Sequence, residues 1–159
     1  MRQFGWVMLA AMLAGCALVP QEPSTGEPPV IDEIPDDVRG PEPAPPPPSA
    51  RTAEQFDTTT AEERAEVIQA AAAPAGDRSL GTTVASLGDP ADPGFWLKTP
   101  LVTTEQPGRV EYAAAGTKVA VTLIPIEGPA TGGSRLSLPA MRLLQAPLTG
   151  LPEITVFAR

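Results

Sequence analysis

The placement of proline is the feature that most constrains how this chain of 159 residues can fold. Of its 21 prolines, eleven lie between Pro20 and Pro48. Proline lacks a backbone N–H and fixes φ, so a segment this rich in it cannot form a regular helix or a central strand. A packed core must therefore come from the later part of the chain. We expect one folded domain, over residues 77–159.

Residues 16–59 are expected to form a disordered, acidic, Pro-rich linker. Between Gln21 and Asp57 the sequence has nine acids and two arginines, a balance of −7. Such a segment has too little apolar surface to offset the entropy that is lost on ordering. A negative chain without a basic patch is also a poor candidate for binding nucleic acid. The linker is therefore predicted to act as a spacer.

The first residues read as an export signal. Arg2 precedes an apolar run over residues 5–14. This run is too short to cross a bilayer, which takes about 20 residues, but it suits the apolar region of a signal peptide. The run ends in Leu-Ala-Gly-Cys, with the cysteine at Cys16, and this sequence resembles the bacterial lipobox.

The resemblance to the lipobox implies where in the cell the protein is located. It implies that a signal peptide over residues 1–15 is removed and that Cys16 is lipidated with acyl chains such as palmitate, which anchor the protein in a membrane. The next residue is Ala17, and by the same resemblance this favours the outer membrane of a Gram-negative envelope, with the domain facing the periplasm.

A short helix is expected over residues 60–73, before the domain. Thr60 and Glu63 have the spacing of a capping box, and Pro74 ends the helical pattern. The predicted apolar stripe of this helix consists of Ala65, Ile68 and Ala72.

The domain itself is predicted to be mainly β. A short helix after the N-cap residue Ser137 should bury Leu138, Met141 and Leu144. A domain of this size buries only about 60% of its unfolded surface, and closing the sheet into a small barrel removes exposed edges. The expected fold is thus a small β-barrel with one or two short helices. Its strands are predicted at residues 80–87, 95–103, 109–112, 118–124 and 153–157.

The stretch from Val119 to Phe157 resembles the end of the double-psi β-barrel of septal lytic transglycosylases of the rare lipoprotein A type. The shared pattern is a hydrophobic strand, Gly-Pro, Gly-Gly-Ser-Arg, Leu-Ser-Leu leading into a short helix, and a final strand. The resemblance implies a double-psi-like barrel. It also implies a catalytic acid two residues before Gly-Pro, where this chain has Ile126 followed by Glu127. Glu127 is a weak catalytic candidate, since it needs a shift of register by one residue.

A second resemblance covers most of the chain. The lipobox, the Pro-rich tail and the segments LGTTVASLGDP, GFWLKTPLV and GGSRLSLPAMRLL resemble a family of small alphaproteobacterial lipoproteins often labelled D-galactarate dehydratase. Dehydration of a sugar acid needs a base and usually a metal. The chain has no histidine and no acid cluster, so its residues do not support a dehydratase (lyase) activity. We expect neither a cofactor nor a metal site.

Three residues are candidates for binding. Trp96 either stacks on a sugar ring as an exposed platform or fills the barrel core. Lys98 lies two residues beyond it. Arg135 closes the Gly-rich loop 128–135, which either holds an anion or is only a turn that needs glycine.

These observations favour a non-catalytic lipoprotein of the cell envelope whose barrel binds peptidoglycan or an envelope partner protein. One alternative is a degenerate glycan-cleaving enzyme, similar to lytic transglycosylases, that uses Glu127. A second is a structural subunit of an envelope assembly that docks through residues 95–102.

Overall fold

The computed structural model describes residues 43–73 and 76–159. The predicted signal peptide over residues 1–15, the predicted lipidation site Cys16 and the predicted linker up to residue 42 lie outside this part of the chain. The described elements, in chain order, are α1 (Ala53–Phe56), α2 (Ala61–Ala72), β1 (Arg78–Leu87), β2 (Trp96–Thr99), β3 (Gln106–Tyr112), β4 (Thr117–Pro125), β5 (Ser134–Leu136), α3 (Leu138–Leu143) and β6 (Glu153–Ala158).

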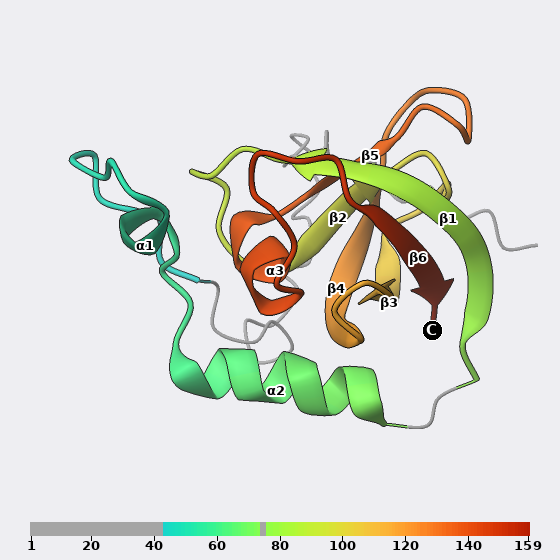
Figure 1. Ribbon diagram of the computed structural model, residues 1–159, viewed down its shortest axis with the longest axis horizontal. Coiled ribbons are helices and arrows are strands. Elements are labelled where there is room, and N and C mark those ends of the chain that lie inside the picture. Colours follow the sequence, from blue (N-terminus) through green and yellow to red (C-terminus); the bar gives the residue numbers. More distant parts are fainter. Residues whose placement is uncertain (1–42, 74–75) are drawn as a thin grey trace, which may run out of the picture. The chain divides into compact units, whose positions relative to one another are not determined.

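The strands close into a barrel in the order β1-β5-β2-β4-β3-β6 (Figure 1). Two pairs are parallel, β1 with β5 and β2 with β4. The other four pairs are antiparallel. Every strand is therefore hydrogen-bonded on both sides, which removes the open edges that a small sheet would expose. The expected fold class, a small and mainly β barrel with short helices, is confirmed.

Strand alternation puts one apolar face of each strand inside the barrel. In β4, Val119, Val121 and Leu123 are buried, while the residues between them are partly exposed. In β6, Ile154 and Val156 are buried in the same way. Each fully buried side chain of this size contributes roughly 1.5–3 kcal/mol to folding, so the alternating pattern largely determines which face of these strands points inward.

Helix α3 carries the buried stripe that the sequence predicts. Leu138, Met141 and Leu144 are all at most 2% exposed. Ser137 occupies the N-cap position, as expected, but its side chain makes no capping hydrogen bond. Its hydroxyl instead accepts a hydrogen bond from the backbone N–H of Trp96, at 3.2 Å. The cap residue therefore joins α3 to β2.

Strand β5 was not among the predicted strands. Its three residues follow two glycines and were expected only to lead into the helix. They become a strand because they fit between β1 and β2, with Ser86 and Lys98 as the two neighbours of Arg135. Pairing with distant strands, which a local pattern does not encode, creates this element.

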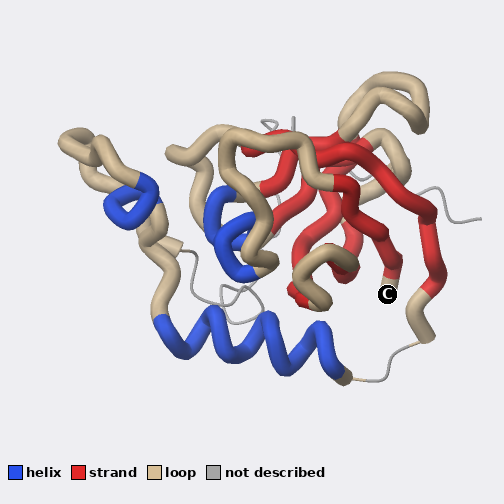
Figure 2. Tube along the Cα trace, viewed as in Figure 1, coloured by secondary structure: helices blue, strands red, loops and turns tan. Residues whose placement is uncertain are grey.

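Helix α2 forms where the sequence predicts it, and its capping box of Thr60 and Glu63 is present. The predicted stripe, however, is wrong. Ile68 is 46% exposed, whereas Ala71 is fully buried and Val67 packs against the core. The helix lies against β4 (Figure 2). The buried face of α2 is therefore the one that carries Val67 and Ala71, next to the face with Ile68 that was predicted from hydrophobicity.

Ordered structure begins earlier than residue 60, the boundary predicted for the end of the linker. Helix α1 has its own capping box, made by Thr52 and Gln55. Ala50 is only 3% exposed. Residues 50–57 thus pack as part of the folded unit, so the expected disordered segment does not extend to residue 59.

Asp57 joins α1 and α2 to α3. Its carboxylate lies 3.3 Å from Arg64 and 2.7 Å from Arg142, and its side chain is 3% exposed. It also accepts a hydrogen bond from the hydroxyl of Thr59 at 2.5 Å. Burial alone raises the pKa of Asp57, but the hydrogen bonds from Thr59 and the charges of Arg64 and Arg142 outweigh it, so the pKa lies below its ordinary value.

Candidate functional site

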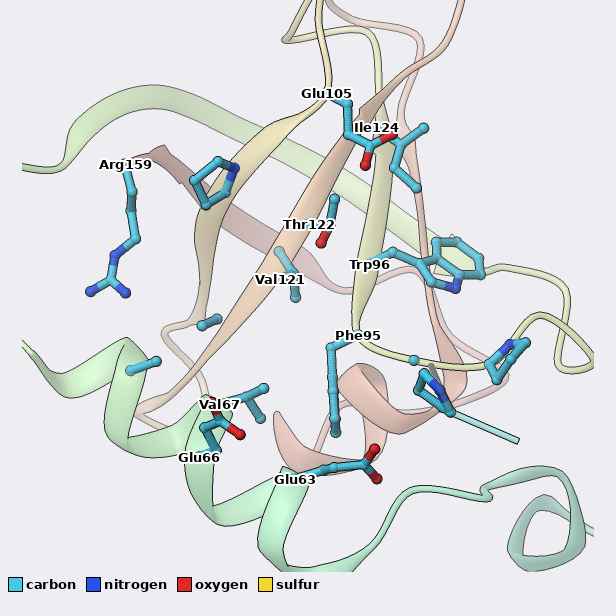
Figure 3. Close-up of a pocket in the computed structure, with 17 residues that line it drawn as sticks. Glu63, Glu66, Val67, Phe95, Trp96, Glu105, Val121, Thr122, Ile124 and Arg159 are labelled. Carbon is cyan, nitrogen blue, oxygen red and sulfur yellow. The ribbon is translucent and has the colours of Figure 1, made fainter. Parts of the chain in front are cut away.

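An open groove of about 700 Å³ lies between α2 and the outer wall of the barrel (Figure 3). Because Val119, Val121 and Leu123 of β4 are buried, the alternate residues Ala120, Thr122 and Ile124 point outward. These three side chains form part of the groove floor. The outer face of β4, which faces water in many barrels, is here the base of a concave surface.

The opposite wall comes from one face of α2. Glu63, Glu66, Val67 and Ala70 line the groove. Their spacing of three and four residues puts them on one side of the helix. The packing of α2 on β4 positions this wall, so the groove exists only because the helix before the domain is part of the folded unit.

The ends of the groove come from loops and from the segments that flank the strands. Pro43, Pro93, Gly94 and Phe95 contribute to the lining. Further lining residues come from the β3 region and from the residue after β6, namely Glu105, Pro107, Gly108 and Arg159. The groove therefore combines apolar and small side chains with a few charged ones, a composition typical of binding sites.

The charges at the groove are mostly negative. Three glutamates line it, against one arginine. Arg159 donates a hydrogen bond to Asp77 at 3.2 Å and another to the carbonyl oxygen of Ala73 at 3.0 Å. Its charge is thus partly neutralised by Asp77, and the glutamates dominate the electrostatics of the site.

Trp96 is neither an exposed platform nor a filler of the barrel interior. It is 5% exposed, yet it is not part of the apolar cluster inside the barrel. Its indole N–H donates to the carbonyl oxygen of Asp92 at 3.2 Å, and the ammonium of Lys98 lies 4.4 Å from the ring centroid. Figure 3 shows the indole directed away from Thr122, at the edge of the groove. Trp96 is therefore covered by the segment that precedes β2.

The structure brings the other two predicted binding residues close to Trp96. Lys98 follows it by two positions, on the same face of β2, and pairs across strands with Arg135 of β5. Lys98 forms an ion pair with Asp92 at 2.7 Å. Arg135 is exposed and makes no ion pair within residues 43–73 and 76–159. Neither Lys98 nor Arg135 lines the groove.

Glu127 lies outside the groove. It follows β4 and Ile126, and its side chain is exposed. The backbone N–H of Ile126 donates to the carbonyl oxygen of Thr99 at 3.2 Å, which fixes this turn. A carboxylic acid that acts as a proton donor in glycan cleavage needs an environment that keeps it protonated and holds the substrate. Glu127 is exposed and does not line the groove, so the groove does not supply this environment.

Residues 95–102 are a predicted docking segment, but half of these residues are buried. Leu97 and Thr99 are fully buried, and Val102 is 6% exposed. The segment contains β2, which lies between β4 and β5 in the wall of the barrel. Docking of a partner through these apolar side chains would require the barrel to open.

Three buried hydroxyls form a chain that joins β1, β5 and β2. Ser134 Oγ lies 3.0 Å from Thr83 Oγ1 and donates to Thr99 Oγ1 at 2.9 Å. A nucleophilic hydroxyl needs an adjacent base, and this chain contains only hydroxyls. Its hydrogen bonds satisfy polar groups inside the barrel, which makes the role structural.

Sequence reasoning missed the acidic side chains of the groove. The helical pattern links Glu63 and Glu66 only to the start of the helix, and no local pattern marks Glu105 as a site residue. They are up to 42 positions apart in the sequence and meet only because α2 packs on the barrel. The one local signal was the spacing of Glu63, Glu66 and Ala70 on a single helix face.

Within the described residues there is no helix both long enough and apolar enough to span a membrane. The same residues contain no cluster of three or more side chains suited to binding a metal ion. Comparison of the chain with family models, with curated proteins and with solved structures finds no match.

Proposed function

We propose that this chain is a lipoprotein of the cell envelope whose barrel is a non-catalytic binding domain. Lipidation at Cys16 anchors it in the outer membrane, facing the periplasm, and the acidic linker holds the domain away from the lipid. The domain binds peptidoglycan or a partner protein of the envelope. The observation that carries the proposal is the groove of about 700 Å³ between α2 and β4.

The groove supports binding rather than cleavage. Its floor includes side chains such as Ala120 and Ile124, which offer apolar contact area to a ligand. The one weak catalytic candidate, Glu127, does not line it. A non-catalytic domain needs only a concave surface held in a fixed shape, which the closed barrel and the packed helix provide.

The role of the groove in binding is tested by a substitution that fills it with a long side chain. Thr122→Arg puts a long side chain on the floor of the groove, and Thr82→Arg is a matched control at an exposed position of β1. The full chain and both variants are incubated with purified peptidoglycan sacculi and, separately, cross-linked in intact envelopes. We expect Thr122→Arg to lose retention or cross-links and Thr82→Arg to keep them. Equal retention of both variants would show that the groove is not the binding site.

The anchor has its own test. Cys16→Ser should abolish incorporation of labelled palmitate and release the domain from the membrane fraction, because the acyl chains provide the attachment. Ser24→Ala, in the linker, serves as a control that should leave both unchanged. Persistent labelling of the Cys16→Ser variant would refute lipidation at this residue.

A further inference from the structure

The acidic side chains of the groove leave two charges without a partner in the described part of the chain. Glu63 is held by the backbone N–H of Thr60, at 2.6 Å, as part of the helix cap. Glu66 and Glu105 are exposed, and neither forms an ion pair among residues 43–73 and 76–159. Both are therefore available to a cationic ligand group.

The surface between these two carboxylates is largely apolar. The groove is lined by Val67 and Ala70 of α2, by Ala120 and Ile124 of β4, and by Phe95. Burying such side chains against a ligand stabilises a complex by roughly 25 cal/mol for each Å² of apolar surface. A ligand that suits the site thus combines apolar groups with positive charges.

We infer that the groove binds an extended, cationic segment of a partner protein, whose lysine or arginine side chains pair with Glu66 and Glu105 while apolar side chains pack between α2 and β4. This inference rests on the proposed binding function and names the partner for the same groove. Recognition of an extended peptide in a groove, with charge complementarity setting orientation, is a common mode of binding.

The chain's own linker is a poor occupant of the groove. Pro43, the first described residue, lines the groove. Residues 17–42, however, contain seven acids and a single basic residue, Arg39. Placing this segment beside Glu66 and Glu105 would bring like charges together. The charge pattern therefore favours a cationic partner protein over this segment as the ligand.

The test measures binding of a short peptide that alternates lysine and valine to the immobilised full chain. A peptide with glutamate in place of lysine is the control ligand. The double variant Glu66→Gln/Glu105→Gln removes the two groove charges, and Glu62→Gln/Glu153→Gln removes two exposed charges that do not line the groove. Two exposed ion pairs predict a loss of affinity of roughly fivefold for the first variant and none for the second.

Three results would overturn the inference. Equal binding of the glutamate peptide and the lysine peptide refutes it, because charge would then be irrelevant to recognition. An equal loss in the two double variants refutes the role of the groove. Deletion of residues 17–42 that raises affinity tenfold or more would show that the linker occupies the groove.

The experiments distinguish failure of the cationic-partner inference from failure of the proposed binding function. In one outcome, the parent chain is retained on sacculi, Thr122→Arg is not, and the lysine peptide does not bind. This result would support the proposed function and refute the cationic partner. Binding of the lysine peptide that is lost in both Thr122→Arg and the groove double variant supports the inference. Absence of all binding, to sacculi, in envelopes and to the peptide, would refute both.

Discussion

Trp96 and Ser137 exchange two hydrogen bonds across 41 positions of sequence. The backbone N–H of Trp96 donates to the hydroxyl of Ser137 at 3.2 Å, and the backbone N–H of Ser137 donates to the carbonyl oxygen of Trp96 at 3.0 Å. This pair fixes the start of β2 against the start of α3. It holds the first residue of a barrel strand to the helix that packs on the core.

Ser137→Ala should therefore destabilise the fold. Ser137 is fully buried, so the substitution leaves the N–H of Trp96 without its partner, which costs about 1–3 kcal/mol. Urea unfolding of the variant against the parent chain measures the loss. Ser49→Ala, at an exposed position, is the matched control and should change the free energy of unfolding by less than about 0.5 kcal/mol. Equal stability of both variants would contradict this role of Ser137.

Gly88 is predicted to be necessary for the packing of Trp96. A Cβ atom at Gly88 would lie 2.3 Å from Cη2 and 2.8 Å from Cζ3 of the indole. Gly88→Ala should displace the ring, shift its fluorescence emission to longer wavelength and destabilise the fold by about 1–3 kcal/mol.

The fluorescence is read in a Trp6→Phe background, so that the signal comes from Trp96 alone. Gly76→Ala is the control, because a Cβ atom there meets no atom within 4 Å. An unshifted emission in Gly88→Ala would mean that the indole is not held against this glycine.

Asp57 should make the stability depend on pH. Its folded-state pKa is lowered, so the ionised carboxylate stabilises the fold above the unfolded-state pKa of about 4, and this stabilisation is lost as the pH falls through the folded pKa. Asp57→Asn should cost about 1–3 kcal/mol at neutral pH.

The difference between Asp57→Asn and the parent chain should shrink as the pH falls below about 4. Urea unfolding at a series of pH values measures it, and Glu153→Gln, at an exposed position of β6, should show no such trend. A difference that is constant with pH would refute the assignment to Asp57.

Glu127→Gln should leave the chain's action on peptidoglycan unchanged. The side chain is exposed and lies outside the groove, so we expect no soluble muropeptides from sacculi incubated with either the parent chain or the variant. Chromatography of the soluble fraction checks this, with a known muramidase as positive control. Muropeptides released by the parent chain and not by the variant would establish Glu127 as catalytic.

The sequence predicts the elements whose signals are local. The alternation of Val119, Val121 and Leu123 indicated β4, and the spacing of Thr60 and Glu63 indicated the start of α2. Both signals depend only on neighbours in the sequence, since strand pleating and helix capping act over a few residues. The closed barrel also followed, because a small β domain has few other ways to protect its edges.

The features that were missed depend on tertiary contacts. The three residues of β5 form a strand only between β1 and β2. On α2, hydrophobicity favoured Ile68 as the buried residue, but the contact with β4 buries Ala71 instead. The groove needs both that contact and the outward residues of β4, so no window of sequence contains it.

The position of β6 has a consequence for how the barrel is completed. β6 pairs with both β1 and β3, and it is the last of the six strands to leave the ribosome. Until it arrives, β1 and β3 each present an unpaired backbone edge, which is the kind of surface that recruits strands from other chains. A premature stop codon or a protease cut before residue 153 would leave the chain permanently in that aggregation-prone intermediate.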